Sequence, residues 1–251
     1  MKISARYFKP LFFMGLLSCF IFQKVLFAGP PYFTDDPLPV EYKHGEIIIA
    51  STFTRDKGGS FGTLPHVDFN YGLWHELQFH VLSAFAFNHE KEAGTNYGYG
   101  DTEIGAKYRF IHETDLIPQV ATYPQVELPT GNDKKGLGNG KTQLFLPLWA
   151  QKTRGLWTAY GGAGYWFNPG EGNKNWVYTG WLLQRDFSKW LTLGSEIFYR
   201  TRDKVDGRSG LGLNGGGQVN FTSNHCLLFS SGADVYGPKH FTLYIGYQWT
   251  F

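Results

Sequence analysis

Four ionisable residues between positions 101 and 109 alternate with apolar ones. Side chains two positions apart on a strand point to the same side, so this stretch has one charged and one apolar face. A charge facing lipid at the bilayer centre costs about 2–4 kcal/mol, so the charged face must contact water or other charges. Three further residues on later strands share this alternation. The candidate water-facing residues are Asp101, Glu103, Lys107, Arg109, Glu127, Glu196 and Arg200.

Motifs for catalysis and for cofactor binding are incomplete in this sequence. Residues 136–142 are similar to a phosphate-binding loop, but Lys135 stands where the first glycine is required. The eight histidines lack the spacing of a zinc site. His80 and Ser83 fall on opposite faces of one strand, so they cannot act together as base and nucleophile. We therefore predict that the chain is not an enzyme and has no cofactor or metal.

Residues 1–28 have the features of a secretory signal peptide. Basic residues precede an apolar run at positions 11–22, and Ala28 marks a small-residue cleavage position. The apolar run is too short for a transmembrane helix. The segment holds four of the 23 basic residues and none of the 21 acidic ones, so 19 basic residues remain in the mature chain. Without excess positive charge, nucleic acid is not an expected partner.

Residues 29–45 contain four prolines, at positions 30, 31, 37 and 39. Proline lacks a backbone donor and fixes φ, so this spacing is incompatible with a helix or a central strand. The segment is either a periplasmic lead-in, a plug inside the barrel or a disordered tail. The sequence leaves these alternatives open, and with them whether the lumen is open or plugged.

Residues 46–251 are predicted to form an all-β, antiparallel transmembrane barrel of about 12 strands. The segments alternate over roughly the 9–11 residues that a tilted strand needs to cross a bilayer. Short and long connections alternate, which predicts a barrel with both termini in the periplasm. Pro118 and Pro124 predict a bend or bulge in the fifth strand. The predicted strands are 46–55, 63–73, 76–88, 98–111, 117–129, 141–152, 156–168, 175–187, 189–201, 210–221, 225–236 and 240–251.

The last strand alternates strictly and ends on an aromatic residue. It resembles the terminal recognition strand of bacterial outer-membrane barrels. This resemblance implies that Tyr247, Trp249 and Phe251 form an assembly signal, read by the barrel-assembly machinery. Tryptophans near strand ends predict two interfacial belts. The periplasmic belt would hold Trp74, Trp157, Trp190 and Trp249, and the outer belt Trp166 and Trp176.

Three stretches resemble the outer-membrane barrel family named after the meta-pathway of phenol degradation. They are Ala-Gly-Pro-Pro-Tyr-Phe-Thr-Asp-Asp-Pro at 28–37, the Gly-Asp strand ending in Lys-Tyr-Arg at 98–110, and Leu-Pro-Thr-Gly at 128–131. The resemblance implies a channel for small, often hydrophobic or aromatic solutes, with no catalytic residues to carry over.

We therefore predict a channel of the bacterial outer membrane that passes small solutes by passive diffusion, with the candidate residues lining its lumen. Its expected partners are outer-membrane lipids, the barrel-assembly machinery and a small-molecule solute. The alternatives are an outer-membrane barrel enzyme acting on lipid, and a closed structural or surface-interaction barrel.

Overall fold

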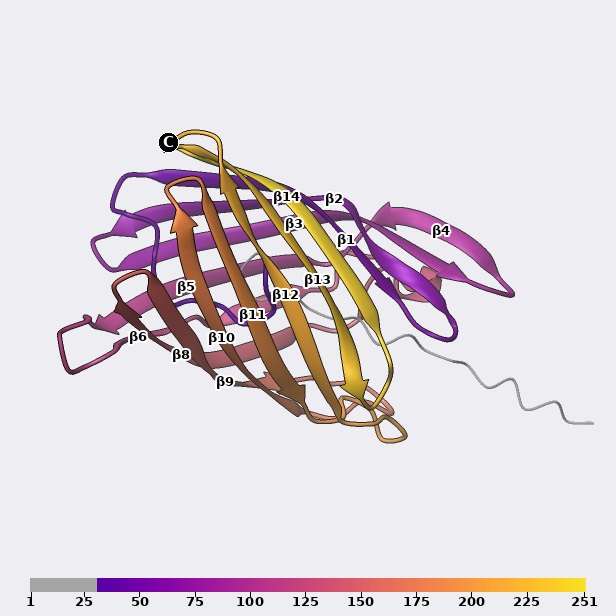
Figure 1. Ribbon diagram of the computed structural model, residues 1–251. Helices are drawn as coiled ribbons and strands as arrows, with labels where there is room; N and C mark the ends of the chain where they lie inside the picture. Colours follow the sequence, from indigo (N-terminus) through magenta and orange to yellow (C-terminus); the bar gives the residue numbers. More distant parts are fainter. Residues whose placement is uncertain (1–30) are drawn as a thin grey trace, which may run out of the picture.

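Residues 31–251 of the chain, described by a computed structural model, form a closed, all-β antiparallel barrel (Figure 1). The predicted signal peptide at 1–28 lies outside the described residues. Fourteen β elements build 12 barrel strands, as the sequence predicted. Their bounds are β1 Gly45–Arg55, β2 Gly59–Trp74, β3 Leu77–Glu90, β4 Gly94–Tyr99, β5 Thr102–Ile111, β6 Gln119–Thr122, β7 Gln125–Leu128, β8 Gln143–Arg154, β9 Trp157–Phe167, β10 Trp176–Ser188, β11 Leu191–Arg200, β12 Gly210–Asn220, β13 His225–Tyr236 and β14 Phe241–Thr250, with a short 3-10 helix at Asp133–Lys135.

Two of the barrel strands are each divided into two elements. Both β4 and β5 pair with β3, and Gly100 and Asp101 separate them. Both β6 and β7 pair with β5 and with β8, and they are separated by Tyr123 and Pro124. Proline offers no N–H to the ladder, so the interruption falls at one of the two prolines that predicted a distortion.

The first and last strands close the barrel. In the antiparallel ladder of β1 and β14, Glu46 lies opposite Thr250 at one end and Arg55 opposite Phe241 at the other. Just beyond this ladder, Gly45 and Phe251 exchange two backbone hydrogen bonds of 2.7 and 2.9 Å. The backbone groups that would form an exposed sheet edge are therefore paired with each other.

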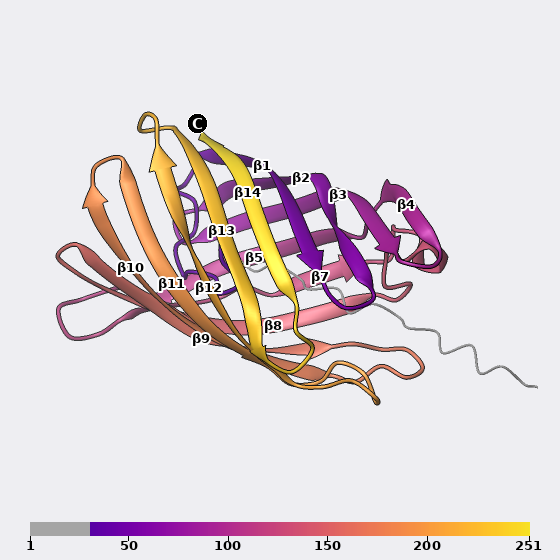
Figure 2. The same cartoon turned by 45° about the vertical axis from the view of Figure 1, so that its right-hand side comes forward.

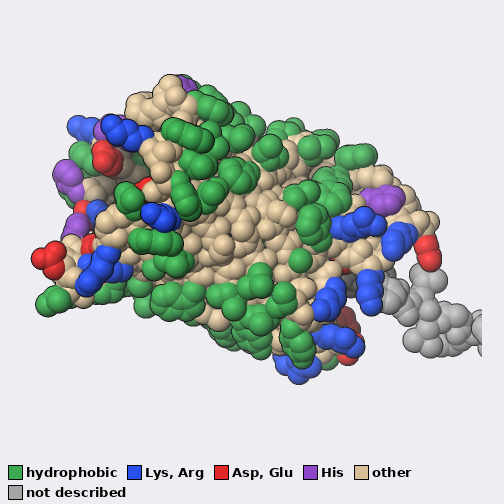
Figure 3. All heavy atoms as spheres, viewed as in Figure 1, with side chains coloured by type: hydrophobic (Ala, Val, Ile, Leu, Met, Phe, Trp, Pro, Cys, Tyr) green, Lys and Arg blue, Asp and Glu red, His purple; other side chains and the backbone are tan. Residues whose placement is uncertain are grey.

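The barrel has an apolar outer wall. Along β14, exposed apolar residues alternate with more buried ones that include Thr242 and Tyr244, as the period-two pattern predicted. Figure 3 shows hydrophobic side chains over the middle of one face, while charged side chains gather toward its two ends. An apolar band between polar rims fits the hydrocarbon layer of a membrane. Among residues 31–251, no helix is long and apolar enough to cross a membrane.

The tryptophans divide between the outer wall and the interior. Trp74, Trp157, Trp190 and Trp249 are all exposed, in agreement with the predicted belt at their strand ends. The prediction of a second belt with Trp166 and Trp176 is wrong. Trp166 is buried among interior aromatic rings, and Trp176 packs against the same cluster. Each of these two residues has the strand parity of inward-facing neighbours, so its position near a strand end did not indicate its face.

The chain that precedes β1 runs inside the barrel. Residues 32–35 are buried, and Tyr42 forms a bridge to Gly72 of β2 just before β1 begins. Figure 2 shows this indigo segment looping through the interior. We call residues 31–44 the interior segment. It corresponds to the proline-rich stretch for which the sequence left a lead-in, a plug and a disordered tail open.

Candidate functional site in the barrel interior

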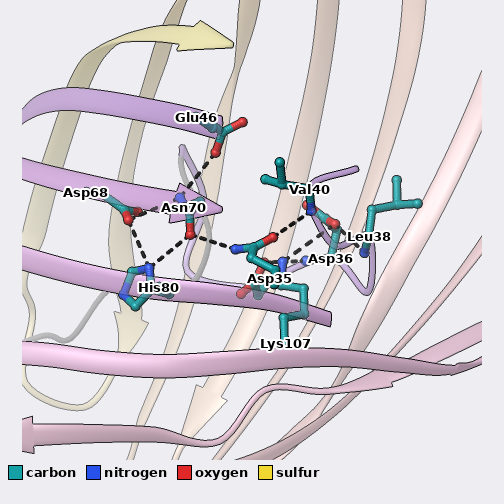
Figure 4. A network of polar contacts seen from close by, with 10 residues as sticks. Asp35, Asp36, Leu38, Val40, Glu46, Asp68, Asn70, His80 and Lys107 are labelled. Carbon is teal, nitrogen blue, oxygen red and sulfur yellow. Dashed lines mark hydrogen bonds and ion pairs between the residues drawn. The ribbon is translucent and has the colours of Figure 1, made fainter. Parts of the chain in front are cut away.

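One wall of the interior carries a network of polar side chains from β1, β2, β3 and β5 (Figure 4). His80 lies between two carboxylates, with Nδ1 2.8 Å from Asp68 Oδ1 and Nε2 3.0 Å from Glu103 Oε1. Asn70 donates hydrogen bonds to Asp68 at 3.1 Å and to Glu46 at 3.2 Å. Buried charges are costly unless they are paired and hydrogen-bonded, so these groups stabilise one another in the interior.

Gln78 of β3 joins this network to the interior segment. Its side-chain amide donates to Asn70 Oδ1 at 2.6 Å, and its Oε1 accepts from the backbone N–H of Val40 at 2.8 Å. Figure 4 shows Val40 of the segment beside the strands that carry Asn70 and His80. The interior segment is therefore bonded to the same groups that organise the wall.

Lys107 of β5 forms an ion pair with the interior segment. Its Nζ lies 3.0 Å from Asp35 Oδ1 and 3.8 Å from Asp36 Oδ1. The Lys107 and Asp35 side chains are only 6% and 1% exposed, so solvent screens their pair little. The ammonium also lies 4.9 Å from the centroid of the Tyr123 ring, within the range of a cation–π contact. Burial raises the pKa of the Asp35 carboxyl to about 6, although the Lys107 ammonium opposes the rise.

On the other side of the interior, the Glu196 carboxylate of β11 accepts five hydrogen bonds. Three come from the interior segment: the N–H of Phe33 at 3.1 Å, the N–H of Thr34 at 2.7 Å and the Thr34 hydroxyl at 2.8 Å. The other two come from the wall, from the Tyr178 hydroxyl at 3.0 Å and the Asn214 amide at 3.2 Å. An ionised carboxylate only accepts hydrogen bonds, so this set of donors matches its charged form.

Aromatic rings cover the wall next to Glu196. The Phe33 ring lies 4.6 Å from that of Phe198, and Phe198 stacks on Tyr178 at 6.2 Å. Phe145 and Trp166 stack at 4.6 Å with an angle of 11° between their planes. The interior thus has a charged side and an aromatic side, and the interior segment touches both. The buried cluster consists of Phe33, Tyr123, Phe145, Trp149, Trp166, Tyr178 and Phe198.

Two glycines on neighbouring strands make room for the interior segment. A Cβ at Gly180 of β10 would lie 2.0 Å from the Thr34 Oγ1, and one at Gly194 of β11 would lie 2.8 Å from the Tyr32 hydroxyl. Atoms do not approach so closely, so a side chain at either position would displace what lies there. The segment therefore fits a surface whose shape depends on these glycines.

The structure places all seven candidate residues at or near the interior, to different depths. Glu103, Lys107, Glu127 and Glu196 are buried, and Arg109, Arg200 and Asp101 are half-buried. Whether they line a path for solute stays a prediction.

Three of the candidates contact residues outside the candidate list. Glu103 contacts His80, Lys107 contacts Asp35, and Arg109 lies 2.6 Å from Glu76. Each of these three charged groups finds a partner that the sequence pattern did not indicate.

The remaining candidates contact residues of the connection between β7 and β8 and residues that flank the short connection between β13 and β14. Asp101 accepts from the N–H groups of Gly131 and Asn139, and Glu127 accepts from the Asn139 amide at 2.6 Å. Arg200 lies 2.8 Å from Asp234, which also pairs with His240 at 2.8 Å. These contacts tie loop residues to the strands at that end of the barrel.

The candidate list missed Asp68 and His80, together with the aromatic side of the interior. Alternation was a usable signal, because Phe145 and Trp149 share the parity of the buried Gln143 and Gln151. Large aromatic residues are expected on the lipid face, so a list built from charged residues alone passes over them. Within residues 31–251, no group of three or more His, Cys, Asp or Glu side chains is arranged so that it could hold a metal ion.

No family model matches the sequence, and no curated protein matches it. Solved structures resemble its fold. An outer-membrane channel from Pseudomonas putida F1 is 17% identical with a TM-score of 0.67, covering 89% of this chain and 99% of that one. The translocator domain of the autotransporter NalP from Neisseria meningitidis is 13% identical with a TM-score of 0.54, covering 85% and 91%. The KdgM porin, solved in complex with disordered oligogalacturonate, is 11% identical with a TM-score of 0.55, covering 81% and 99%.

These similarities are at the level of the fold, and the outer wall agrees with them. The closed antiparallel barrel, its apolar band and its polar rims are features that membrane-spanning barrels share. The chain therefore has the fold of outer-membrane β-barrels.

Proposed function

We propose that this chain is an outer-membrane channel for small solutes, which pass by diffusion when the interior segment shifts from its seat. The observation that carries the proposal is how the segment is held. Phe33 and Thr34 are bonded to Glu196, and Asp35 to Lys107, through side chains of the wall. Such contacts can be exchanged for water or solute without unpairing the barrel strands.

The interior suits solutes with both polar and apolar parts. Charged and amide groups cover one side, and the cluster around Phe198 and Tyr178 covers the other. Solute sites in barrels combine apolar walls with a few placed polar groups. Small aromatic or hydrophobic solutes with polar substituents are the substrate class that we propose.

The test is flux through the purified, refolded chain in liposomes and planar bilayers. The solute panel should hold aromatic, sugar and ionic compounds, and heat-modifiable migration on a gel confirms that the barrel has folded. We expect flux above that of empty liposomes, and a larger flux when Glu196→Gln weakens the segment's seat. Absence of flux in both proteins would contradict the proposal.

The filled interior favours a second candidate, a closed barrel that acts through its loops or its structure. The buried side chains of Tyr32, Phe33, Thr34 and Asp35 occupy the interior that a solute would use. A closed barrel predicts no conductance in either protein of the test above. Conductance in the Glu196→Gln variant alone would show a channel that rests in a closed state.

Assembly and lipid contact belong to the same proposal. Tyr247, Trp249 and Phe251 are exposed on the outer wall beside the seam of β1 and β14. Their position supports a role as the signal that the barrel-assembly machinery reads. The exposed apolar band supports outer-membrane lipids as the surrounding partner.

A further inference from the structure

Three consecutive residues of the interior segment contact the barrel wall as one ligand would. The Phe33 ring packs on Phe198, and the backbone N–H groups of Phe33 and Thr34 donate to Glu196. One residue later, the Asp35 carboxylate meets the Lys107 ammonium. Within three residues, the segment thus presents an aromatic ring, two N–H donors and a carboxylate. On the wall they meet an aromatic ring, a carboxylate and an ammonium group, respectively.

The wall groups are also held by contacts that do not involve the segment. Glu196 is bonded to Tyr178 and Asn214, and Lys107 lies over the Tyr123 ring. A site whose groups are already oriented by their neighbours binds a ligand at a lower cost in ordering. The arrangement therefore remains a binding site when the segment leaves.

Trp149 adds a polar group to the aromatic side. Its indole is fully buried within the cluster that receives Phe33, and within residues 31–251 its Nε1 has no hydrogen-bond partner. Buried donors are normally paired, so such a group indicates a missing acceptor. A solute carboxylate or carbonyl oxygen beside the ring would supply one.

We propose, on the basis of the channel function above, that the interior binds an aromatic solute that carries an amino group close to its ring. The ring takes the place of Phe33 against Phe198. The ammonium donates to Glu196, where the backbone N–H of Phe33 now binds. The segment is thus a built-in competitor for the solute.

The charges of the site select against simpler aromatic compounds. Glu196 is an acceptor, and charged donors form its strongest hydrogen bonds. A neutral hydrocarbon would fill the space of the ring and leave Glu196 without the donors that the segment gives it. The loss of one hydrogen bond to a charged group corresponds to roughly 10- to 100-fold in affinity.

The test measures binding to the full chain in detergent by calorimetry, with phenylalanine, 3-phenylpropionate and leucine as probes. The first pair differs in the amino group, and leucine lacks the ring. Phe33→Ala removes the competing ring, and Phe187→Ala is its control because Phe187 is 57% exposed on the outer wall. We expect Phe33→Ala to bind phenylalanine roughly 10-fold more tightly than the parent or the control, and to bind the other two probes more weakly than phenylalanine.

A second substitution tests whether Glu196 is the group that binds the amino group of the probe. Adding Glu196→Gln to Phe33→Ala should abolish the preference for phenylalanine over 3-phenylpropionate, while gel migration reports whether the barrel is folded. Equal binding of these two probes by folded Phe33→Ala would overturn the inference. So would a preference that survives Glu196→Gln.

Conductance in simple salt separates this inference from the channel proposal. A protein that conducts ions but does not distinguish the probes is a channel with another substrate. A protein that distinguishes the probes but conducts no ions, with or without Glu196→Gln, has the binding site and contradicts the channel.

Discussion

The backbone N–H of Thr34 donates a 2.7 Å hydrogen bond to Oε1 of Glu196, although 162 positions separate the two residues. The Thr34 hydroxyl donates to the same oxygen at 2.8 Å. One side chain of β11 therefore fixes both the backbone and a side chain of the interior segment.

Replacing Glu196 with glutamine should loosen the interior segment. The substitution keeps the size of the side chain and removes the charge from an acceptor of five hydrogen bonds. Hydrogen bonds to charged groups contribute about 1.5–3 kcal/mol, so losing one corresponds to at least a tenfold rise in the undocked fraction. Single-channel recording should show a higher open probability. An unchanged open probability in a correctly folded variant would argue against the role of Glu196 in holding the interior segment.

Gly180→Ala should displace the segment by shape alone. The added Cβ would lie 2.0 Å from Thr34 Oγ1, whereas a Cβ at Gly215 would meet only the Gly194 carbonyl oxygen, at 3.9 Å. Gly215→Ala is therefore the matched control on a nearby strand. We expect faster proteolysis of the segment and a larger conductance for Gly180→Ala alone. The same increase in both variants would point to a general loosening of the barrel.

Acidification should favour the docked segment. Burial raises the pKa of Asp35 from 3.8 to about 6, with Lys107 opposing this rise and Asp36 adding to it. The docked carboxyl takes up a proton near pH 6, whereas the same carboxyl in water does so near pH 4. Docking therefore strengthens as the pH falls through this window, by up to about tenfold per pH unit. Conductance should fall between pH 7 and pH 5, and Asp35→Asn should flatten this part of the pH profile.

Removal of Phe251 should impair assembly of the barrel. Its backbone exchanges two hydrogen bonds with Gly45, and a Cβ on Gly45 would lie 2.5 Å from the Phe251 ring. Phe241→Ala changes an equally exposed phenyl at the other end of the same strand and is the control. Cell fractionation should find less of the truncated protein in the outer membrane, with export across the inner membrane intact. Normal assembly of the truncated protein would show that Phe251 is not required for the assembly signal.

The alternation of residue types predicted the facing of side chains well. It placed Glu103 and Lys107 inward because the period of a strand is two and lipid excludes charge. It could not predict their partners, since His80 and Asp35 come from other parts of the chain. A local sequence pattern does not show which residues far apart in the chain will contact each other after folding.

The prolines before β1 excluded a helix or a central strand in that segment. They did not indicate whether the segment lies inside or outside the barrel. Its seat depends on Gly180, on Gly194 and on the Glu196 carboxylate, which the barrel brings together only on closing. Trp166 and Trp176 also show that position in the sequence did not determine position in the folded barrel. Their nearness to strand ends suggested a lipid interface, but the pleat turned them inward.

The interior segment continues without a break into β1, and this tether sets the concentration against which a solute competes. A ligand joined by a short linker to its own site has an effective concentration on the order of millimolar. Individually weak contacts at Phe33, Thr34 and Asp35 are therefore sufficient to keep the site occupied. Free peptide of the same sequence, dilute in the surrounding medium, would rarely replace it. In the channel that we propose, the length of residues 31–44 therefore helps to set the range of solute concentration over which the segment would be displaced.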